Sequence, residues 1–337
     1  MNLIQEAEIL LATDERAALK KYMQSIEFEP DFAPMACFRI GEISNRMGEA
    51  LNSFQYHEMA YKLNPGFSEV IVQPEHPSYV YVYKEPVEHK VTKCPLCGSG
   101  GAPYAAFNVT TSIDFLHGFH PVRLWMACDD CHHLFAHNYP VQLNDILSNS
   151  AFEFNLKPKP HLFPLLSSIV MNITNLAPGR KLLEVGVGAG EFSAVAKEFL
   201  FDVTGLDIRS AYAKAVSEML DIPVYTSDFD AFESVDGYDV IVMGDVIEHM
   251  ADPLRALRKA HSLLNDNGVL WISTPNFESA FSMVSKDKDP MWRIVEHLNY
   301  FSYRSLGLWL NRIGFEVVNY SVSSHYNGSM EVTAIKR

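Results

Sequence analysis

Short apolar runs alternate with stretches typical of helices, such as Glu191–Leu200, along the second half of the chain. The strand-like runs are Lys181–Val187, Val203–Ile208, Val224–Thr226, Val240–Met243, Val269–Ser273, Phe315–Tyr320 and Met330–Ile335. Strands that alternate with helices form doubly wound parallel sheets. We therefore predict an α/β fold with a mostly parallel seven-stranded sheet, which ends in the antiparallel hairpin Phe315–Ile335.

Residues 3–63 carry apolar residues at helical spacing, with no interior proline before Pro30. Four positions of a weak repeat, Ala18, Tyr22, Ser25 and Pro30, recur 35 residues later as Ser53, His57, Ala60 and Pro65. Gly41 stands where such a unit makes its first close helix contact. The spacing resembles tetratricopeptide repeats, which are helix pairs of about 34 residues. A generic helical bundle is the alternative, because a repeat stack needs about three units.

Prolines mark two boundaries between the helical region and the α/β region. Residues 71–92 hold Pro74, Pro77 and Pro86 beside the strand-like run Tyr79–Tyr83, which indicates a linker into a small β module. A second proline-rich stretch, 157–160, precedes the last part, and proline moves its predecessor away from the helical conformation. The predicted parts are residues 1–70, 71–150 and 151–337.

Length, charge and cysteine content narrow the function classes. The 337 residues are 48% apolar, enough for more than one core. With 27 basic and 41 acidic residues the net charge is −14, so nucleic acid is not an expected partner. The segment 1–11 carries Glu6 and Glu8 rather than a basic leader, and no run reaches the roughly 18 apolar residues of a membrane span. We expect a cytoplasmic protein.

Four of the five cysteines stand in two Cys-x-x-Cys pairs: Cys94, Cys97, Cys128 and Cys131. Four thiolates from two tight turns can surround one zinc ion tetrahedrally, and a closed sulfur shell is typical of structural zinc sites. His132 and His133 follow the second pair and could replace one thiolate. Cys37, alone in the helical region, is interpreted as a buried apolar residue.

A glycine-rich turn follows the first strand of the α/β region. Glu184 precedes the glycines Gly186, Gly188 and Gly190, and a helix begins directly after them. Glycines let the backbone approach a ligand, and a helix start presents free N–H groups. The spacing differs from the dinucleotide fingerprint Gly-x-Gly-x-x-Gly, and a carboxylate beside a pyrophosphate is unfavourable. The implied cofactor has an amino group and lacks phosphate.

With these residues, 180–337 resemble class I S-adenosylmethionine-dependent methyltransferases, of the small-molecule group that includes ubiquinone-biosynthesis methyltransferases. The resemblance implies that Glu184 and the three glycines hold the methionine and ribose portions of the cofactor. It further implies that Asp207, with Ile208, binds the ribose hydroxyls, that Asp228, with Phe229, lies beside the adenine, and that Asp245 and Val246 flank the methionine part. Asp207 or Asp228 alone is equally an ordinary strand-end turn residue. Asp252 is interpreted as a helix N-cap before Pro253.

Methyl transfer requires a held acceptor and, for an oxygen or carbon acceptor, a base. A long insertion after the fifth strand contains Glu296 and His297 and lies at the ligand-binding edge of the sheet. His297 is the leading candidate base, with Glu296 to orient it, and His249 is the competing candidate. For each histidine the alternative is a structural hydrogen bond. The charged run 286–289 is expected to be a solvated lid tip.

The zinc-type module together with the sequence Glu-His-Leu-Asn-Tyr-Phe-Ser also resembles nucleotide-sugar C-methyltransferases, in which a tyrosine and the Glu-His pair serve proton abstraction. Here Glu296 and His297 match, whereas Ile294 stands in place of the tyrosine, and we do not expect the further carboxyl-terminal domain of that family after the hairpin Phe315–Ile335. Both departures count against a sugar acceptor.

Two functions follow as hypotheses. The first is a methyltransferase that acts on a small molecule, either a sugar or a biosynthetic intermediate, with S-adenosylmethionine as cofactor and a structural zinc ion. The alternative is a scaffold or protein methyltransferase that recruits a protein partner through the helical repeats.

Overall fold

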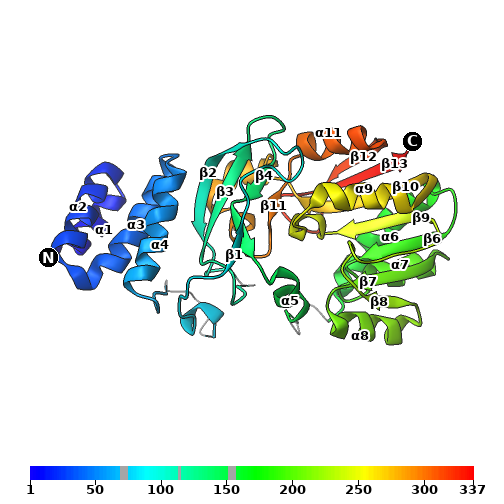
Figure 1. Cartoon of the computed structure of the whole chain (residues 1–337), viewed down its shortest axis with the longest axis horizontal. Coiled ribbons are helices and arrows are strands. Elements are labelled where there is room, and N and C mark those ends of the chain that lie inside the picture. The colour runs from blue at the N-terminus through cyan, green and yellow to red at the C-terminus, as the bar shows by residue number, and fades with distance from the viewer. Residues whose placement is uncertain (69–74, 113–114, 151–156) are drawn as a thin grey trace.

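The computed structural model describes residues 1–68, 75–112, 115–150 and 157–337. The chain forms an elongated molecule in which helices, a middle sheet and a larger α/β unit follow one another from the N-terminus to the C-terminus (Figure 1). Pro74 and the predicted boundary 70/71 lie outside the described residues, and the predicted boundary 150/151 borders such a segment. The division into three parts therefore stays a prediction.

Four helices form the N-terminal part, as expected: α1 (Leu3–Leu11), α2 (Glu15–Phe28), α3 (Ala33–Arg46) and α4 (Ala50–Leu63). The six repeat positions that lie within α2 and α4 are all buried: Ala18, Tyr22, Ser25, Ser53, His57 and Ala60. A β-carbon at Gly41 would lie 2.7 Å from the ring of His57, so α3 and α4 pack closely at this glycine. Membership of the tetratricopeptide class stays a prediction.

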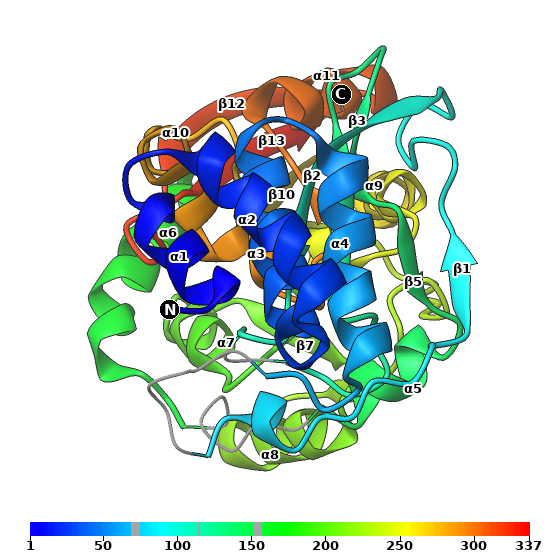
Figure 2. The same cartoon turned by 90° about the vertical axis from the view of Figure 1, so that its left-hand side faces the viewer.

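The middle sheet has the order β11-β4-β3-β2 and is antiparallel. Its strands are β2 (Gly101–Asn108), β3 (Val122–Cys128), β4 (Leu134–Ala136) and β11 (Asn299–Tyr300), and a separate ribbon pairs β1 (Glu88–Lys90) with β5 (Asn138–Pro140). Figure 2 shows the helices α1–α4 in front of this sheet. Tyr61 of α4 donates its hydroxyl to Asn108 of β2 at 2.8 Å, and Asn45 of α3 accepts from the amide of Ala106 at 2.9 Å. Strand β11 comes from the insertion of the α/β unit.

The run Tyr79–Tyr83 is not a strand, contrary to the prediction. It follows the short 3-10 helix η2 (Pro77–Tyr79) and continues as irregular backbone. Tyrosine and valine alternate along this run because single side chains pack inward: Tyr81 and Tyr83 are buried near Tyr61, whereas Val80 and Val82 are exposed.

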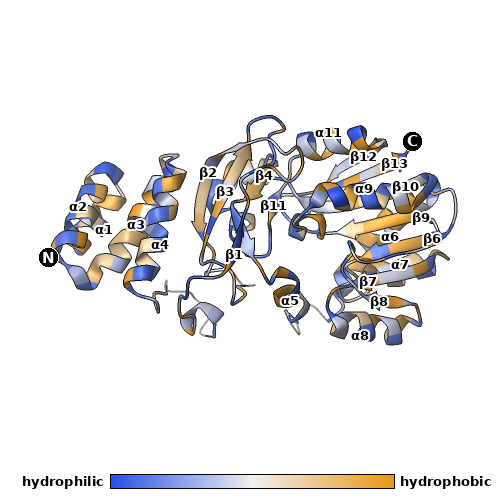
Figure 3. Cartoon of the chain, in the orientation of Figure 1, coloured by the Kyte–Doolittle hydropathy of each residue, from blue (hydrophilic) through white to orange (hydrophobic). Residues whose placement is uncertain are grey.

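The α/β unit contains a seven-stranded sheet of order β12-β13-β10-β9-β6-β7-β8. The strands are β6 (Lys181–Val185), β7 (Asp202–Asp207), β8 (Val224–Thr226), β9 (Tyr238–Gly244), β10 (Leu264–Pro275), β12 (Phe315–Val322) and β13 (Ser329–Lys336). The first five are parallel, and β13 pairs antiparallel with β10 and β12. All seven predicted runs are strands, so the predicted fold class is confirmed. Apolar residues concentrate on the central strands (Figure 3).

Helices cover both faces of this sheet: α6 (Phe163–Leu176), α7 (Glu191–Glu198), α8 (Ser210–Leu220), α9 (Pro253–Leu263) and α11 (Tyr303–Ile313). Short helices α5 (Leu143–Ser148) and α10 (Ala280–Ser285) flank the unit. Asp252 caps α9 by accepting the amide of Arg255 at 2.9 Å, with Pro253 at the first helical position, as predicted. In the described part of the chain, no helix has the length and apolar content needed to cross a bilayer.

The charged run 286–289 is not a fully solvated tip. Asp289 is buried because its carboxylate accepts the Tyr300 hydroxyl at 2.7 Å and caps the 3-10 helix η7 (Pro290–Arg293). The carbonyl of Lys286 accepts the indole N–H of Trp292 at 2.9 Å. The run therefore folds back onto the insertion that it begins.

Candidate cofactor and active site

A cavity of about 910 Å³ opens at the carboxyl edge of the parallel strands, where ligands bind in doubly wound folds. Nine of the ten predicted cofactor residues line it: Glu184, Gly186, Gly188, Asp207, Ile208, Asp228, Phe229, Asp245 and Val246. Gly190 instead forms the N-cap of α7 in a left-handed conformation. The three candidate catalytic residues line the same cavity. These predicted cofactor and catalytic residues, which are spread over more than a hundred positions of the sequence, thus meet at one site.

The glycine turn shapes the floor of the cavity. Gly186 has φ of +79°, and a β-carbon there would lie 2.6 Å from a methyl group of Val246. Gly188 has φ of +52°, and a β-carbon there would meet no atom within 4 Å. Glycine at 186 is therefore required by both backbone and space, whereas glycine at 188 leaves the backbone open toward a ligand.

Glu184 lies at the end of β6 and is 5% exposed. Its carboxylate accepts the hydroxyl of Ser193 on α7. Burial raises the pKa of Glu184 to about 8, with the neighbouring Glu191 and Asp207 adding to the effect. A desolvated carboxyl group of this kind gains from a cationic ligand that lets it ionise.

Asp207 ends β7 and is 2% exposed. Both of its oxygens accept from the Arg209 guanidinium, at 2.9 and 3.1 Å, and the amide of Gly188 donates to it at 3.3 Å. Arg209 also stacks on Tyr212, with 3.9 Å between guanidinium carbon and ring centroid. The sequence analysis missed Arg209, although an arginine two residues after a strand-end aspartate was a usable signal.

Asp228 follows the end of β8, the neighbour of β7, and precedes the buried Phe229. Its carboxylate accepts the amide of Asp230 at 3.0 Å and the side-chain amide of Asn144 at 2.8 Å. Asn144 belongs to α5 and precedes the α/β unit in the chain. No sequence motif indicated this contact.

Asp245 follows β9 with φ of +52° and accepts the hydroxyl of Ser273 at 3.0 Å. Burial raises the pKa of Asp245 to about 6, and Glu331 contributes further. Glu331 pairs with Ser273 in the register of β13 and β10 and also lines the cavity. The sequence analysis treated β13 only as part of a hairpin and missed Glu331.

The candidate catalytic residues form one cluster. The Nδ1 atom of His249 lies 3.1 Å from the carbonyl oxygen of Glu296 and 3.9 Å from its carboxylate. The rings of His249 and His297 are 4.9 Å apart. Glu296 thus contacts His249, and the expected role of Glu296 in orienting His297 stays a prediction.

Burial favours the neutral form of both histidines. Burial lowers the pKa of His249 to about 4 and lowers that of His297 well below its usual value. His297 is 5% exposed, and its Nδ1 atom has no hydrogen-bond partner within the described residues. A neutral imidazole can accept a proton.

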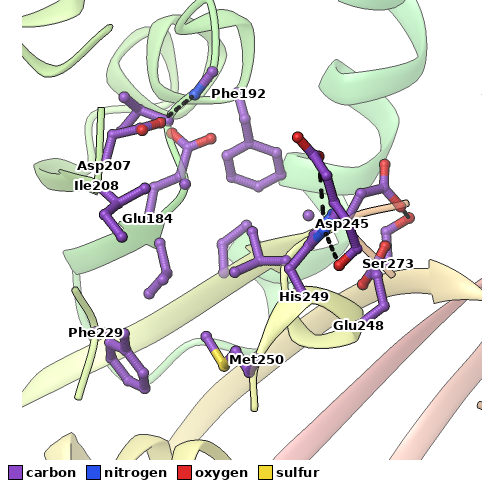
Figure 4. Close-up of a pocket in the computed structure, with 18 of the residues that line it drawn as sticks. Glu184, Phe192, Asp207, Ile208, Phe229, Asp245, Glu248, His249, Met250 and Ser273 are labelled. Atoms are coloured by element: carbon purple, nitrogen blue, oxygen red, sulfur yellow. Dashed lines mark hydrogen bonds and ion pairs between the residues drawn. The ribbon is translucent and has the colours of Figure 1, made fainter. Parts of the chain in front are cut away.

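Glu248 adds a buried carboxyl group that the sequence analysis did not single out. Thr274 donates to one of its oxygens at 2.9 Å, and the other oxygen is unpartnered among the described residues. Burial raises its pKa well above the usual range, and Asp245 raises it further. One ligand atom each from Glu248, His249 and His297 lies within 4.8 Å of the others, a spacing that suits a metal ion. Figure 4 shows Glu248, His249, Asp245 and Ser273 across the cavity from Glu184 and Asp207.

The middle sheet holds the insertion that carries Glu296 and His297. Four hydrogen bonds cross between them: Arg123 to the Val295 carbonyl at 2.6 Å, Trp125 to the Trp292 carbonyl at 3.2 Å, His133 to the Asn299 side chain at 3.0 Å, and the Ala136 amide to the Leu298 carbonyl at 2.8 Å. On its other side, the amide of Leu298 donates to the Glu248 carbonyl at 2.8 Å. The insertion is therefore a bridge between the two sheets.

The four paired cysteines meet at the edge of the middle sheet. The sulfur atoms of Cys94 and Cys131 are 3.6 Å apart, and those of Cys97 and Cys128 are 3.3 Å apart. A zinc ion with zinc–sulfur bonds of about 2.3 Å requires sulfur–sulfur edges of about 3.8 Å, so a small expansion accommodates it. His133 pairs with Asn299 instead of joining the cluster. The donor set fits a closed, structural zinc site.

Comparison with known proteins gives matches in the α/β unit. Residues 159–320 match the family described as "Methyltransferase domain". The ubiquinone biosynthesis O-methyltransferase of Aliivibrio fischeri (strain MJ11) is 28% identical over 131 residues, which cover 37% of this chain and 56% of that protein. The protein of the same name from Vibrio campbellii (strain ATCC BAA-1116) is 30% identical over 132 residues, with 37% and 56% covered. The chain thus spans about half the length of these curated relatives.

Among solved structures, magnesium protoporphyrin IX methyltransferase from Synechocystis PCC 6803 with bound SAH aligns with a TM-score of 0.44 and 18% identity. The alignment covers 52% of this chain and 83% of that chain.

Proposed function

Residues 159–320 form a methyltransferase domain, and from this premise we propose that the chain transfers a methyl group from S-adenosylmethionine to a small-molecule acceptor. The relatives named above are ubiquinone biosynthesis O-methyltransferases, which favours an oxygen of a biosynthetic intermediate as the methylated atom. A sugar is the other candidate acceptor. The proposed parts are a helical region at 1–70, a zinc module at 71–150 and the catalytic domain at 151–337.

One observation carries the proposal: two buried carboxyl groups, Glu184 and Asp207, end adjacent strands beside the open backbone of the glycine turn. Carboxyl groups in this position suit a ribose and an amino group, whereas they offer no hydrogen-bond donor to a pyrophosphate. S-adenosylmethionine offers the first two groups and lacks the third.

When bound, the cofactor supplies an electrophilic methyl group. The chain's own residues must then hold the acceptor and take its proton. We assign His297 as the base, since its Nδ1 is buried without a partner among the described residues, in a side chain that lines the cavity. His249, which Glu296 holds through its backbone and carboxylate, is the competing base. Burial lowers the pKa of both rings, which favours the unprotonated form from which a base must start.

We also propose that Cys94, Cys97, Cys128 and Cys131 hold a structural zinc ion. The support is the convergence of four sulfur atoms with near-tetrahedral spacing. The ion would stabilise the sheet that anchors the catalytic insertion.

Calorimetry on the full chain tests the cofactor assignment. We expect S-adenosylmethionine to bind and NAD not to bind. Substitution Asp207→Ala should weaken binding by about ten- to a hundredfold, because hydrogen bonds to a charged group contribute about 1.5–3 kcal/mol. The matched control is Asp202→Ala, at the exposed opposite end of the same strand. Unchanged affinity in Asp207→Ala, or tighter binding of NAD, would contradict the assignment.

A further inference from the structure

We propose that Asn144, on α5 outside the matched domain, is a cofactor-binding residue that recognises the adenine amino group together with Asp228. The inference rests on the proposed function, because it assumes that the cofactor's adenine lies beside Asp228. It makes the cofactor site a composite of two parts of the chain.

Helix α5 lies between the middle sheet and the large sheet, to the left of strands β7 and β8 in the view of Figure 1. Leu143 is 7% exposed and packs in an apolar cluster with Phe115 and Phe119 of the middle part. Ile146 packs so closely on Gly118 that a β-carbon there would lie 2.8 Å from it. The helix is thus anchored on the side of the zinc module.

The same helix reaches the cofactor cavity. Asn144 and Leu147 line the cavity although they precede the residues that match the methyltransferase family. The Nδ2 atom of Asn144 donates to Asp228 Oδ2 at 2.8 Å. Asp228 Oδ1 is held by the amide of Asp230 at 3.0 Å, so the carboxylate is fixed from both sides.

This hydrogen bond also fixes the orientation of the asparagine. Since Nδ2 faces the carboxylate, Oδ1 of Asn144 remains as an acceptor, and within the described residues no donor reaches it. The Asn144 amide and the Asp228 carboxylate are thus hydrogen-bonded neighbours that both line the cavity, and each offers an acceptor oxygen.

Adenine fits this pair because its exocyclic amino group carries two N–H donors, one for each oxygen. A hypoxanthine base carries a carbonyl oxygen in the same place and would set three acceptors against one another. A site built to pair with a donor rejects an analogue that lacks it, since its polar groups are left unpaired. Asn144 would thus contribute both affinity and selectivity for adenine.

Calorimetry with S-adenosylhomocysteine and S-inosylhomocysteine tests the inference on the full chain. Asn144→Ala should bind S-adenosylhomocysteine about five- to tenfold more weakly, the effect of one lost hydrogen bond. Asn149→Ala, an exposed asparagine just after the same helix that does not line the cavity, should bind like wild type. Wild type should prefer the adenine compound by more than tenfold, and Asn144→Ala should reduce this preference.

Equal affinity of wild type and Asn144→Ala for S-adenosylhomocysteine would overturn the inference and leave the proposed function standing. An equal loss for both compounds would also overturn it, because Asn144 would then act on packing rather than on the amino group. If wild type binds neither compound, the proposed function fails, and the inference fails with it.

Discussion

Removal of the zinc site should release the catalytic insertion while leaving the large sheet folded. The perturbation is the double substitution Cys94→Ser and Cys128→Ser, which takes one sulfur from each pair. Structural zinc binding contributes about 10–16 kcal/mol in small zinc domains. This is comparable to the total stability of most domains, about 5–15 kcal/mol. The middle sheet should therefore lose its fixed structure.

The consequence for the active site can be worked from the bonds that cross between the sheets. Besides the backbone pairing of β11 with β4, four hydrogen bonds join the middle sheet to residues 292–299. At about 1 kcal/mol each, the loss of these four bonds alone removes about 4 kcal/mol from the ordered insertion, which lowers its population by about a thousandfold. His297 and Glu296 would lose their fixed positions.

The assay combines metal analysis with amide hydrogen exchange. Wild type should contain about one zinc ion per chain and the variant none. The amide of Ala136, which donates to Leu298, should lose its protection, whereas amides of the central strands β6 and β9 should keep theirs. Cys37→Ala is the matched control, because it removes a buried cysteine outside the cluster. A metal-free variant that still protects Ala136 would refute the reasoning.

Two further predictions concern the cofactor side of the cavity. Because burial raises the pKa of Glu184 to about 8, affinity for S-adenosylmethionine should rise with pH by up to tenfold per unit and level off above about pH 8, as measured by calorimetry. Glu184→Gln should abolish this slope. An unchanged dependence of affinity on pH in Glu184→Gln would contradict the assignment. Glu184→Gln should also unfold at a higher temperature than wild type at pH 8. The reason is that the raised pKa of Glu184 stabilises the folded state below pH 4.5, and this contribution is lost as pH rises through 8. Gly186→Ala should lower the melting temperature and weaken cofactor binding, because an alanine at φ of +79° costs about 1–2 kcal/mol and its β-carbon meets Val246. Adding Val246→Ala should recover part of the loss, and a single variant as stable as wild type would show that the turn is not constrained.

The large sheet was predictable because its central strands β6, β9 and β10 are short apolar runs that are buried along most of their length. The edge strands β8 and β12 are largely exposed, and their prediction rested on the regular alternation of strand-like and helical stretches. The glycine turn was predictable for a similar reason, since the acidic residue and glycines lie close together in sequence. Both are features of contiguous residues.

Features that depend on distant contacts were not predictable. Strand β11 has only two residues, one of them the polar Asn299, and it pairs with a strand more than 160 positions earlier. Asp289 belongs to a run of alternating charge that indicated solvent, but the Tyr300 hydroxyl satisfies its carboxylate inside the protein. Asn144 reaches Asp228 only because α5 is anchored elsewhere. In each case a single tertiary partner outweighs the local pattern.

The pairing of β11 with the middle sheet limits which truncated forms of the protein can stay soluble. A fragment that begins at residue 157 would keep all seven strands of the large sheet, but it would strip the backbone of Asn299 and Tyr300 of the neighbour that now covers it. The ring of Trp292, whose centroid lies 5.5 Å from that of Phe107, would also become exposed to solvent. Unpaired strand edges and exposed aromatic rings promote aggregation. Expression of residues 157–337 alone should therefore yield aggregated protein, unless residues 1–156 are co-expressed.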